Sequence, residues 1–195
     1  MPDNDPNIST NLDSYQVAEE LAARLDAAGC EYALGGAIAL GFWAEARGTL
    51  DVDVTLYLSL DDSAGCLQLL EKIGCDVDHS RALEMLQEHS FCQVQLVGIR
   101  LDVFLPMSSF YEAAKARRRE VPIGNRRAYI WDAETLCVFK MMFFRQKDLV
   151  DIQSVLRSQG ASLDRAWVEK SLLELYGSRD PRIGRWRGLA ADIKE

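Results

Sequence analysis

The stretch YALGGAIALGFWAEARGTLDVDVTL, residues 32–56, constrains the fold more than any other part of the chain. A short apolar run ends in Gly35 and Gly36, an alanine-rich segment follows, and an alternating segment then places Asp51 and Asp53 among apolar residues. Strand side chains alternate between two faces, so both aspartates project from one face, about 7 Å apart. Because neighbouring like charges repel, this pattern predicts a compensating cation.

Hydrophobic periodicity predicts helices and strands in alternation, followed by helices alone. We expect helices at residues 14–28, 37–46, 63–73, 81–88 and 108–119, with strands at 31–34, 49–58 and in a hairpin at 91–105 that turns near residues 97–98. A short extended piece, a long helix at 132–156 and a helix at 163–176 follow. This order predicts an α+β fold, a small mixed β-sheet flanked by helices with a C-terminal helical subdomain. We expect a flexible leader at 1–12, a core at 13–130 and the helical subdomain at 131–195.

Composition excludes several classes of protein. No run approaches the roughly 20 apolar residues that span a bilayer, so we expect no membrane partner. The polar, acidic start is unlike a secretory signal, and the five scattered cysteines form no CxxC pair, so we expect a cytoplasmic protein. The net charge of −8 argues against a protein whose entire surface binds nucleic acid. Basic segments at 115–120, 125–127 and 179–187 leave local RNA docking open.

A further aspartate, Asp102, lies on the polar face of the second hairpin arm, together with Arg100 and Phe104. If this arm neighbours the segment of Asp51 and Asp53, three carboxylates converge. Mg²⁺ is the hard cation that suits carboxylate and phosphate oxygens, and two such ions about 4 Å apart stabilise an in-line phosphoryl displacement. Glycines let a backbone approach a triphosphate, and a helix N-terminus favours the anion. Taken alone, the glycine pair has a plainer interpretation as a tight turn. The D-x-D motif, taken alone, has a plainer interpretation as a solvated acidic face.

These residues, taken in order, resemble the signature of the polymerase-β-like nucleotidyltransferases, a glycine pair, a helix and D-x-D on the next strand. More narrowly, GGAIAL…ARGTLDVDV resembles the GG-x-A-L…R-x-T-x-D-x-D form of the AbiEii-toxin-like branch. The later block KMMFFRQKDLVDI, residues 140–152, resembles the K…R-x-K-D-x-x-D-I element of that branch. The two blocks cover about a quarter of the chain.

The resemblance implies that residues 13–130 are a nucleotidyltransferase catalytic core, with two Mg²⁺ ions and an NTP, expected to be ATP, as substrate. It implies Asp51, Asp53 and Asp102 as catalytic and metal-binding residues, Asp102 also serving as base. Nucleotide binding would fall to the following residues: Gly35, Gly36, Arg47 and Lys140. One departure is Ala37, which stands where many members carry Ser or Thr after the glycines. A hydroxyl contact to phosphate is thereby lost, which shifts binding onto the two basic residues.

Several side chains have a structural interpretation beside the functional one. Arg47 is placed to reach a phosphate or to pair with Asp51, and Thr49 to bond its own backbone. In an unbroken helix Lys140, Lys147 and Asp151 share one stripe, and the last two make a suitable i, i+4 pair. We expect a functional Lys140 and structural roles for Asp148 and Asp151. The other expected placements are surface histidines (His79, His89), apolar packing at 139–144, and Trp186 holding the tail to the domain.

The leading hypothesis is an enzyme that moves a nucleoside monophosphate from an NTP to a hydroxyl. The toxin-like resemblance implies RNA, particularly tRNA, as acceptor and a possible antitoxin or regulatory partner. The acidic balance and small size suit a small-molecule acceptor, as in antibiotic-modifying relatives, and a protein acceptor is a further option. The alternatives are a non-catalytic binding module of the same fold and a hydrolase using the same metals. Base preference and oligomeric state are left open.

Overall fold

The computed structural model describes residues 12–192, so most of the expected leader lies outside the described residues. One sheet holds the strands in the order β3-β4-β2-β1-β6-β5. The strand bounds are β1 Tyr32–Leu34, β2 Asp51–Leu56, β3 Phe91–Leu96, β4 Ile99–Phe104, β5 Arg119–Ile123 and β6 Arg126–Ile130. Pairing is parallel for β2 with β4 and for β1 with β6, and antiparallel elsewhere. The expected α+β fold with a mixed sheet is confirmed.

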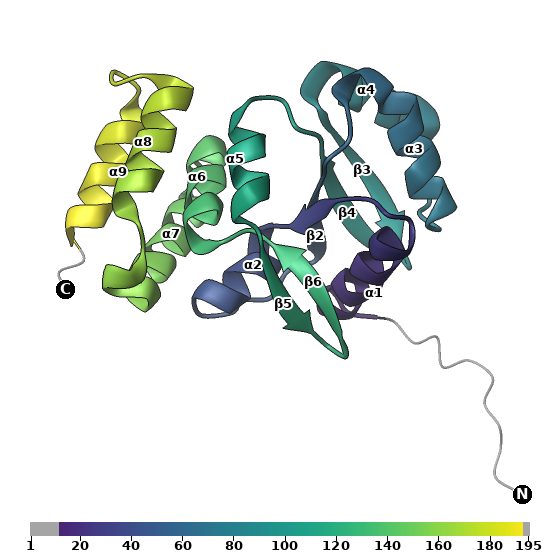
Figure 1. The fold of residues 1–195 in the computed structure, drawn as a ribbon, viewed down its shortest axis with the longest axis horizontal. Coiled ribbons are helices and arrows are strands. Elements are labelled where there is room, and N and C mark those ends of the chain that lie inside the picture. Colours follow the sequence, from purple (N-terminus) through teal and green to yellow (C-terminus); the bar gives the residue numbers. More distant parts are fainter. Residues whose placement is uncertain (1–11, 193–195) are drawn as a thin grey trace, which may run out of the picture.

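Helices cover this sheet and extend the molecule away from it. Their bounds are α1 Ser14–Ala27, α2 Gly36–Trp43, α3 Ser63–Lys72, α4 His79–His89, α5 Phe110–Arg117, α6 Ala133–Phe143, α7 Gln146–Gln159, α8 Arg165–Tyr176 and α9 Pro181–Asp192, with short 3₁₀ turns at Leu60–Asp62 and Gly160–Ser162. Figure 1 shows α3 and α4 beside β3 and β4 at one end, and α8 and α9 at the opposite end. Within residues 12–192, no helix combines the length and apolarity that crossing a membrane requires.

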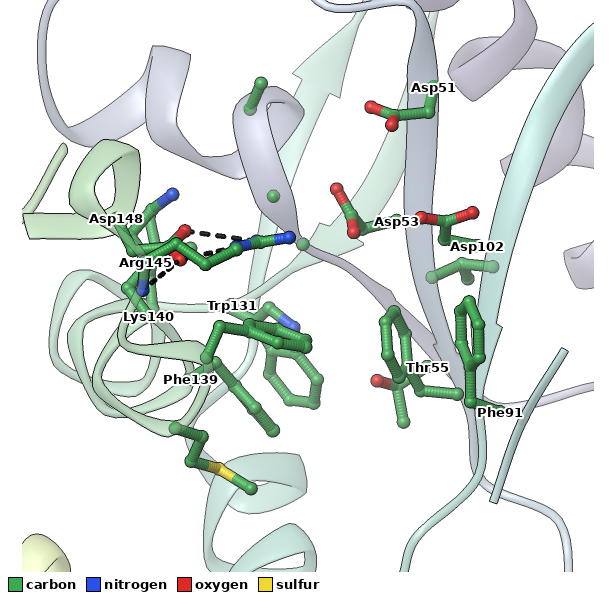
Figure 2. A pocket seen from close by; sticks show the side chains of 18 of the residues that line it. Asp51, Asp53, Thr55, Phe91, Asp102, Trp131, Phe139, Lys140, Arg145 and Asp148 are labelled. Atoms are coloured by element: carbon green, nitrogen blue, oxygen red, sulfur yellow. Dashed lines mark hydrogen bonds and ion pairs between the residues drawn. The ribbon is translucent and has the colours of Figure 1, made fainter. Parts of the chain in front are cut away.

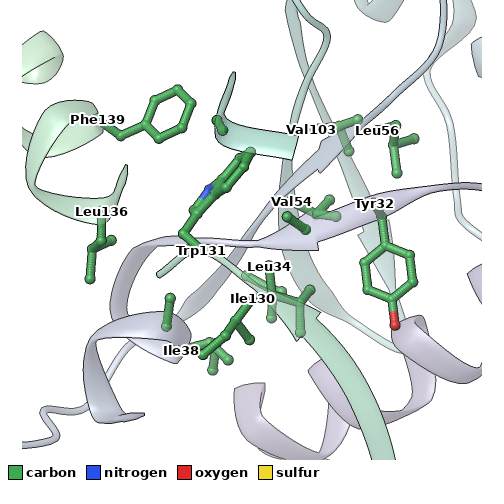
Figure 3. Packing of buried hydrophobic residues seen from close by; sticks show 14 of the residues in the cluster. Tyr32, Leu34, Ile38, Val54, Leu56, Val103, Ile130, Trp131, Leu136 and Phe139 are labelled. Carbon is green, nitrogen blue, oxygen red and sulfur yellow. The ribbon is translucent and has the colours of Figure 1, made fainter. Parts of the chain in front are cut away.

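The central strands have their register set by buried aliphatic side chains. Val52 and Val54 of β2 and Leu101 and Val103 of β4 are all buried on one face. A slip by one residue would turn these side chains toward the polar face, so burial fixes the pairing. In that pairing Val52 lies opposite Leu101 and Val54 opposite Val103. Figure 3 shows the aliphatic core continuing through Leu34 and Ile130 to α6.

The observed strand β2 is shorter than the expected 49–58. It begins at Asp51, and Leu50, which precedes it in the same apolar alternation, is 89% exposed. Its apolar side chain therefore continues the alternating pattern without being buried. The hairpin of β3 and β4 does turn at Val97 and Gly98, as expected.

The C-terminal elements differ from the expectation in three places. The piece expected to be merely extended is the hairpin β5–β6, which pairs with β1. The single helix expected at 132–156 is two helices, because Phe144 adopts a left-handed φ of 55° and Arg145 is extended. Asp148 accepts a hydrogen bond from the Arg145 N–H at 3.1 Å and so starts α7. The third difference is the tail, where no helix was expected and α9 forms; Trp186 is buried there, as expected. The domain division near residue 130 stays a prediction.

Candidate active site

A cavity of about 630 Å³ opens between the polar face of β2 and β4 and the helices α2, α6 and α7. Its volume suits a small molecule. Every residue predicted for the site lines it: Gly35, Gly36, Arg47, Asp51, Asp53, Asp102 and Lys140. Residues far apart in the sequence thus meet on one surface, because β2 and β4 are neighbours and α6 packs over them.

The acidic side of the cavity is formed by β2 and β4. Parallel pairing sets Asp53 opposite Asp102, and Asp51 lies on the same face of β2. Figure 2 shows all of these carboxylates turned toward the cavity. The expected convergence of the acids is confirmed, and it follows directly from the strand register.

The environment separates these acids electrostatically. Burial raises the pKa of Asp53 to about 6, and the charges of Asp102 and Asp51 add to the rise. Burial also raises the pKa of Asp102, against the opposing effect of Arg100. For Asp51 the same burial effect is outweighed by hydrogen bonds from Thr49 and Arg100, so its pKa is lowered. The site therefore holds two carboxyls that resist ionisation beside one that ionises readily.

Arg100 is the cation that sequence reasoning missed. Its guanidinium contacts the Asp51 carboxylate and lies 3.1 Å, Nε to Oδ1, from Asp102. It lies on β4, two residues before Asp102 and opposite Asp51 of β2, whereas the convergence predicted from the sequence concerned the carboxylates alone. The alternation that places Asp102 on the polar face also places Arg100 there, so the signal was present in the sequence.

The glycine pair is required by the side chains beside it. Gly36 has a left-handed φ of 52°, and a Cβ added there would lie 1.7 Å from Oδ2 of Asp53. A Cβ on Gly35 would lie 2.9 Å from the indole Nε1 of Trp131. The Gly35 N–H also donates to the Asp53 carbonyl at 2.9 Å. The glycines thus let α2 begin against the acidic strand, where an L side chain would collide with Asp53.

The two predicted basic residues both pair with Asp151. Arg47 bonds it through Nε and Nη2 at 3.0 and 2.9 Å, rather than pairing with Asp51, and Lys140 bonds it at 2.5 Å. Lys140 and Asp151 are each 4% exposed. The expected pairing of Asp151 with Lys147 is wrong, since the break before α7 turns Asp151 toward Lys140 and Arg47. The structural role expected for Asp151 agrees with this ion-pair network.

Two further cations lie on the cavity wall, Arg145 at the N-cap of α7 and Lys147 in its first turn. Arg145 bonds Asp148 at 2.7 Å and extends toward Asp53 (Figure 2). Lys147 is exposed, makes no ion pair within the described part of the chain, and lowers the pKa of Asp51 by its charge. Both belong to the R-x-K-D block, which the sequence singled out without assigning these two residues to the nucleotide.

A neighbouring part of the cavity is apolar, and we call it the aromatic chamber. It consists of Phe91, Phe104, Met107, Trp131, Phe139 and Phe143. The ring centroids of Phe91 and Phe104 are 4.9 Å apart, and those of Trp131 and Phe139 are 4.7 Å apart. We had expected residues 139–144 to be core packing only, but Phe139 and Phe143 line this cavity. A helix face with this composition has the same pattern whether it faces a core or a ligand pocket.

In residues 12–192 no group of three or more His, Cys, Asp or Glu is placed so that it could hold a metal ion as it stands. The carboxylates of the cluster are nevertheless the kind of ligand that a hard divalent cation binds. Asp53 accepts no hydrogen bond from the described residues, and its pKa is raised by burial and then by the charges of Asp102 and Asp51. Carboxylate oxygens without other partners are what Mg²⁺ requires. Arg100 currently bridges the other two acids, so its guanidinium must move for all three carboxylates to bind a metal.

Searches with the sequence find nothing similar, neither a known protein family nor a curated protein. A search of solved structures finds the solution structure of the antibiotic-resistance factor ANT(2'')-Ia, with a TM-score of 0.56 and 16% identity over 93% of this chain and 98% of that one. The crystal structure of ANT(2'')-Ia in complex with adenylyl-2''-tobramycin gives 0.54 and 14%, over 80% and 93% of the chains.

The lincomycin-bound crystal structure of the lincosamide antibiotic adenylyltransferase LnuA has a TM-score of 0.50 and 14% identity. It covers 70% of this chain and 94% of that one. Structural similarity at identities this low bears on the fold alone. Together with the sheet order and the C-terminal helices, it establishes which fold this is. The chain has the nucleotidyltransferase fold.

Proposed function

We propose that this chain is an adenylyltransferase or related nucleotidyltransferase that modifies a hydroxyl of a small molecule. The observation that carries the proposal is the convergence of Asp51, Asp53 and Asp102 on one wall of the cavity, opposite the cations at the start of α7. Mutually repelling buried acids destabilise a fold unless a bound cation uses them. The D-x-D motif, the glycine pair and the nucleotidyltransferase fold independently support the same reaction.

The three carboxylates divide the work of the reaction. Asp51 and Asp53, with Asp102 beside them, would hold Mg²⁺, which when bound neutralises the triphosphate and stabilises the attacking and leaving oxygens. Asp102 takes the proton of the acceptor hydroxyl, a role that its raised pKa suits. The acceptor oxygen then bonds to the α-phosphorus while the bond to the β-phosphate oxygen breaks, and pyrophosphate leaves with that electron pair.

The triphosphate is held, in this proposal, chiefly by Arg145 and Lys147. Lys140 and Arg47 are both bound to the buried carboxylate of Asp151, and Lys140 is itself buried. Arg145 is also paired, with Asp148, but its side chain is 53% exposed and extends toward Asp53 (Figure 2). Lys147 is exposed at the cavity edge and close enough to act on Asp51. A hydrated ammonium of this kind serves a phosphate as a mobile point charge. We therefore assign Lys140 and Arg47 mainly to shaping the phosphate side of the cavity.

A small-molecule acceptor is better supported than tRNA. The basic segments that would dock RNA are largely neutralised within the chain: Lys115 and Arg118 pair with Glu31, Arg117 with Asp132 and Glu134, and Arg127 with Glu120. The cavity is also of small-molecule size. The printed descriptions of the similar structures name an antibiotic-resistance factor and a lincosamide adenylyltransferase. The toxin-like branch, with its antitoxin partner, stays a prediction from the resemblance alone.

The test is label transfer by the purified chain. It is incubated with Mg²⁺ and each α-labelled NTP in turn, together with hydroxyl-bearing antibiotics or with total cellular RNA, and pyrophosphate release is followed in parallel. We expect label on a small molecule, with none in the Asp51→Ala/Asp53→Ala control. Label on tRNA-sized RNA instead would refute the small-molecule choice and favour the toxin-like activity. Absence of both label and pyrophosphate would refute the enzyme.

A further inference from the structure

The aromatic chamber adjoins Asp102 rather than the glycines. Phe104 lies two positions beyond Asp102 on the same face of β4. On β3 the partners of these residues are Phe91 and Gln93, paired with Phe104 and Asp102 respectively. The Gln93 amide donates to the Asp102 carboxylate at 3.1 Å, which holds that carboxylate at the mouth of the chamber. The chamber therefore borders the carboxylate that receives the acceptor's proton in the proposed reaction.

The phosphate-binding features lie elsewhere in the cavity. Gly35 and Gly36 begin α2 beside Asp53, and Arg145 and Lys147 extend from α7. Figure 2 shows Arg145 on one side of the acids and Phe91 beside Asp102 on another. A triphosphate bound against the cations leaves the chamber to the molecule that carries the attacking hydroxyl.

The chamber is preformed and partly open to solvent. Its rings contact each other in a chain that joins Phe91 to Phe104 and Phe104 to Phe143. Met107 and Phe143 are 56% and 45% exposed, an unfavourable placement for side chains of this size. Large apolar side chains exposed together around a concave site are typical of ligand-binding surfaces. The surface suits the apolar face of a ring.

The charges around the cavity exclude a strongly cationic acceptor. Among the described residues that line it, the carboxylates are the three clustered acids and Asp148. Asp148 is held by Arg145, and Arg100 bridges Asp51 and Asp102. The same wall carries the following cations: Arg47, Arg100, Lys140, Arg145 and Lys147. With Asp53 holding Mg²⁺ as in the proposed function, an acceptor with several ammonium groups would have to desolvate them with no free carboxylate on this wall to pair with.

We propose that the aromatic chamber is the acceptor subsite and that it takes an uncharged or singly charged molecule with an apolar ring and a hydroxyl, rejecting polycationic aminosugars. This inference rests on the proposed function, because it takes Asp102 as the base that faces the acceptor. The chemical step is the one already given, with the acceptor oxygen bonding to the α-phosphorus and pyrophosphate leaving.

Calorimetric binding with Mg²⁺ and a non-hydrolysable ATP analogue tests this assignment. The probes are chloramphenicol, which is uncharged, lincomycin, which carries one basic amine, and tobramycin, which is polycationic. We expect at least one of the first two to bind about tenfold or more tightly than tobramycin. Phe104→Ala should weaken that binding by about tenfold, because a buried aromatic contact is lost. The ATP analogue alone should bind Phe104→Ala and the unmodified chain equally well.

Two variants control for folding. Met107→Glu changes an exposed side chain, so the fold is retained, and the added carboxylate should shift preference toward tobramycin. Tyr15→Ala removes a 42% exposed aromatic side chain on α1, outside the cavity, and should change nothing. Three outcomes would overturn the inference: tobramycin binds most tightly, neither other probe binds a chain that binds the analogue, or Phe104→Ala weakens the analogue itself, which would assign the chamber to the nucleotide base.

The inference and the proposed function fail in different ways. If chloramphenicol or lincomycin binds through Phe104 but no acceptor receives label, the reaction is refuted and the chamber stands as a binding site. If label reaches tobramycin or RNA while the other probes do not bind, the reaction stands and the chamber assignment is refuted.

Discussion

Replacing Asp53 by Asn should stabilise the metal-free protein at neutral and alkaline pH. Asp53 is partly buried beside Asp102 and Asp51, and burial with their charges raises its pKa from 3.8 to about 6. A raised pKa in the folded state means that folding favours the protonated carboxyl. The stability associated with this group is therefore fully present below about pH 4 and is lost as the pH rises through 6.

The magnitude follows from the same shift. Each pKa unit corresponds to about 1.4 kcal/mol, so the change from 3.8 to about 6 implies a penalty of about 3 kcal/mol for the ionised Asp53. Asparagine retains the shape and carries no charge, and within residues 12–192 no hydrogen bond to the Asp53 carboxylate is lost. The free energy of unfolding of Asp53→Asn should exceed that of the unmodified chain by about 2–3 kcal/mol at pH 8. Near pH 4 the two should be equal.

Urea unfolding in EDTA, at intervals from pH 4 to pH 8, measures this difference. Asp51→Asn is the matched control, because hydrogen bonds from Thr49 and Arg100 lower the pKa of Asp51. Its stabilising contribution is present above the unfolded pKa and is lost as the pH falls, so this variant should be less stable than the unmodified chain at pH 8. If Asp53→Asn were also destabilised at pH 8, a protein cation rather than a metal would be compensating Asp53, and our account of the cluster would be refuted.

Three other substitutions test separate parts of the site. Gly36→Ala should lower the free energy of unfolding, measured in urea, by about 1–3 kcal/mol, because φ is 52° and the new Cβ would lie 1.7 Å from Oδ2 of Asp53. Gly41→Ala is the control: its new Cβ would have its nearest contact at 3.5 Å, so stability should be unchanged or increased. Arg100→Gln should tighten Mn²⁺ binding severalfold by freeing Asp51 and Asp102, and unchanged affinity in a titration would contradict this role. Asp151→Asn should lower the free energy of unfolding, followed by thermal denaturation, by about 3 kcal/mol, because Lys140 is left buried without its charged partner. Lys170→Ala, which removes one member of an exposed ion pair, should lower it by about 0.5 kcal/mol or less.

The sequence predicts the acidic wall well because it depends on local rules. Strand alternation fixes the common face of Asp51 and Asp53, and the same rule places Asp102 on the polar face of its hairpin. Register between the two strands follows from burying the valines and leucines on the other face. Each of these inferences needs only the period of a strand and the cost of exposing apolar side chains.

The rest of the site depends on contacts that no local pattern specifies. The break at Phe144 divides the single predicted helix into α6 and α7. It also orients α7 so that Asp151 contacts Lys140 and Arg47. Asp148 caps α7 from a position three residues after Arg145. Because the apolar helical pattern continues on both sides of this point, periodicity alone predicts one unbroken helix. The aromatic chamber was missed because Phe139 and Phe143 have the same helical spacing as core residues, and only the packing of α6 over β4 leaves a cavity there.

Binding of Mn²⁺ followed by electron paramagnetic resonance, with the non-hydrolysable ATP analogue at pH 8, tests the central claim most directly. The acidic cluster is claimed to be a metal and triphosphate site. We predict Mn²⁺ binding that strengthens when the analogue is added, and a loss of about a hundredfold or more in Asp53→Asn, since the buried charge is what holds the ion. Equal Mn²⁺ affinity in Asp53→Asn and the unmodified chain would contradict the claim.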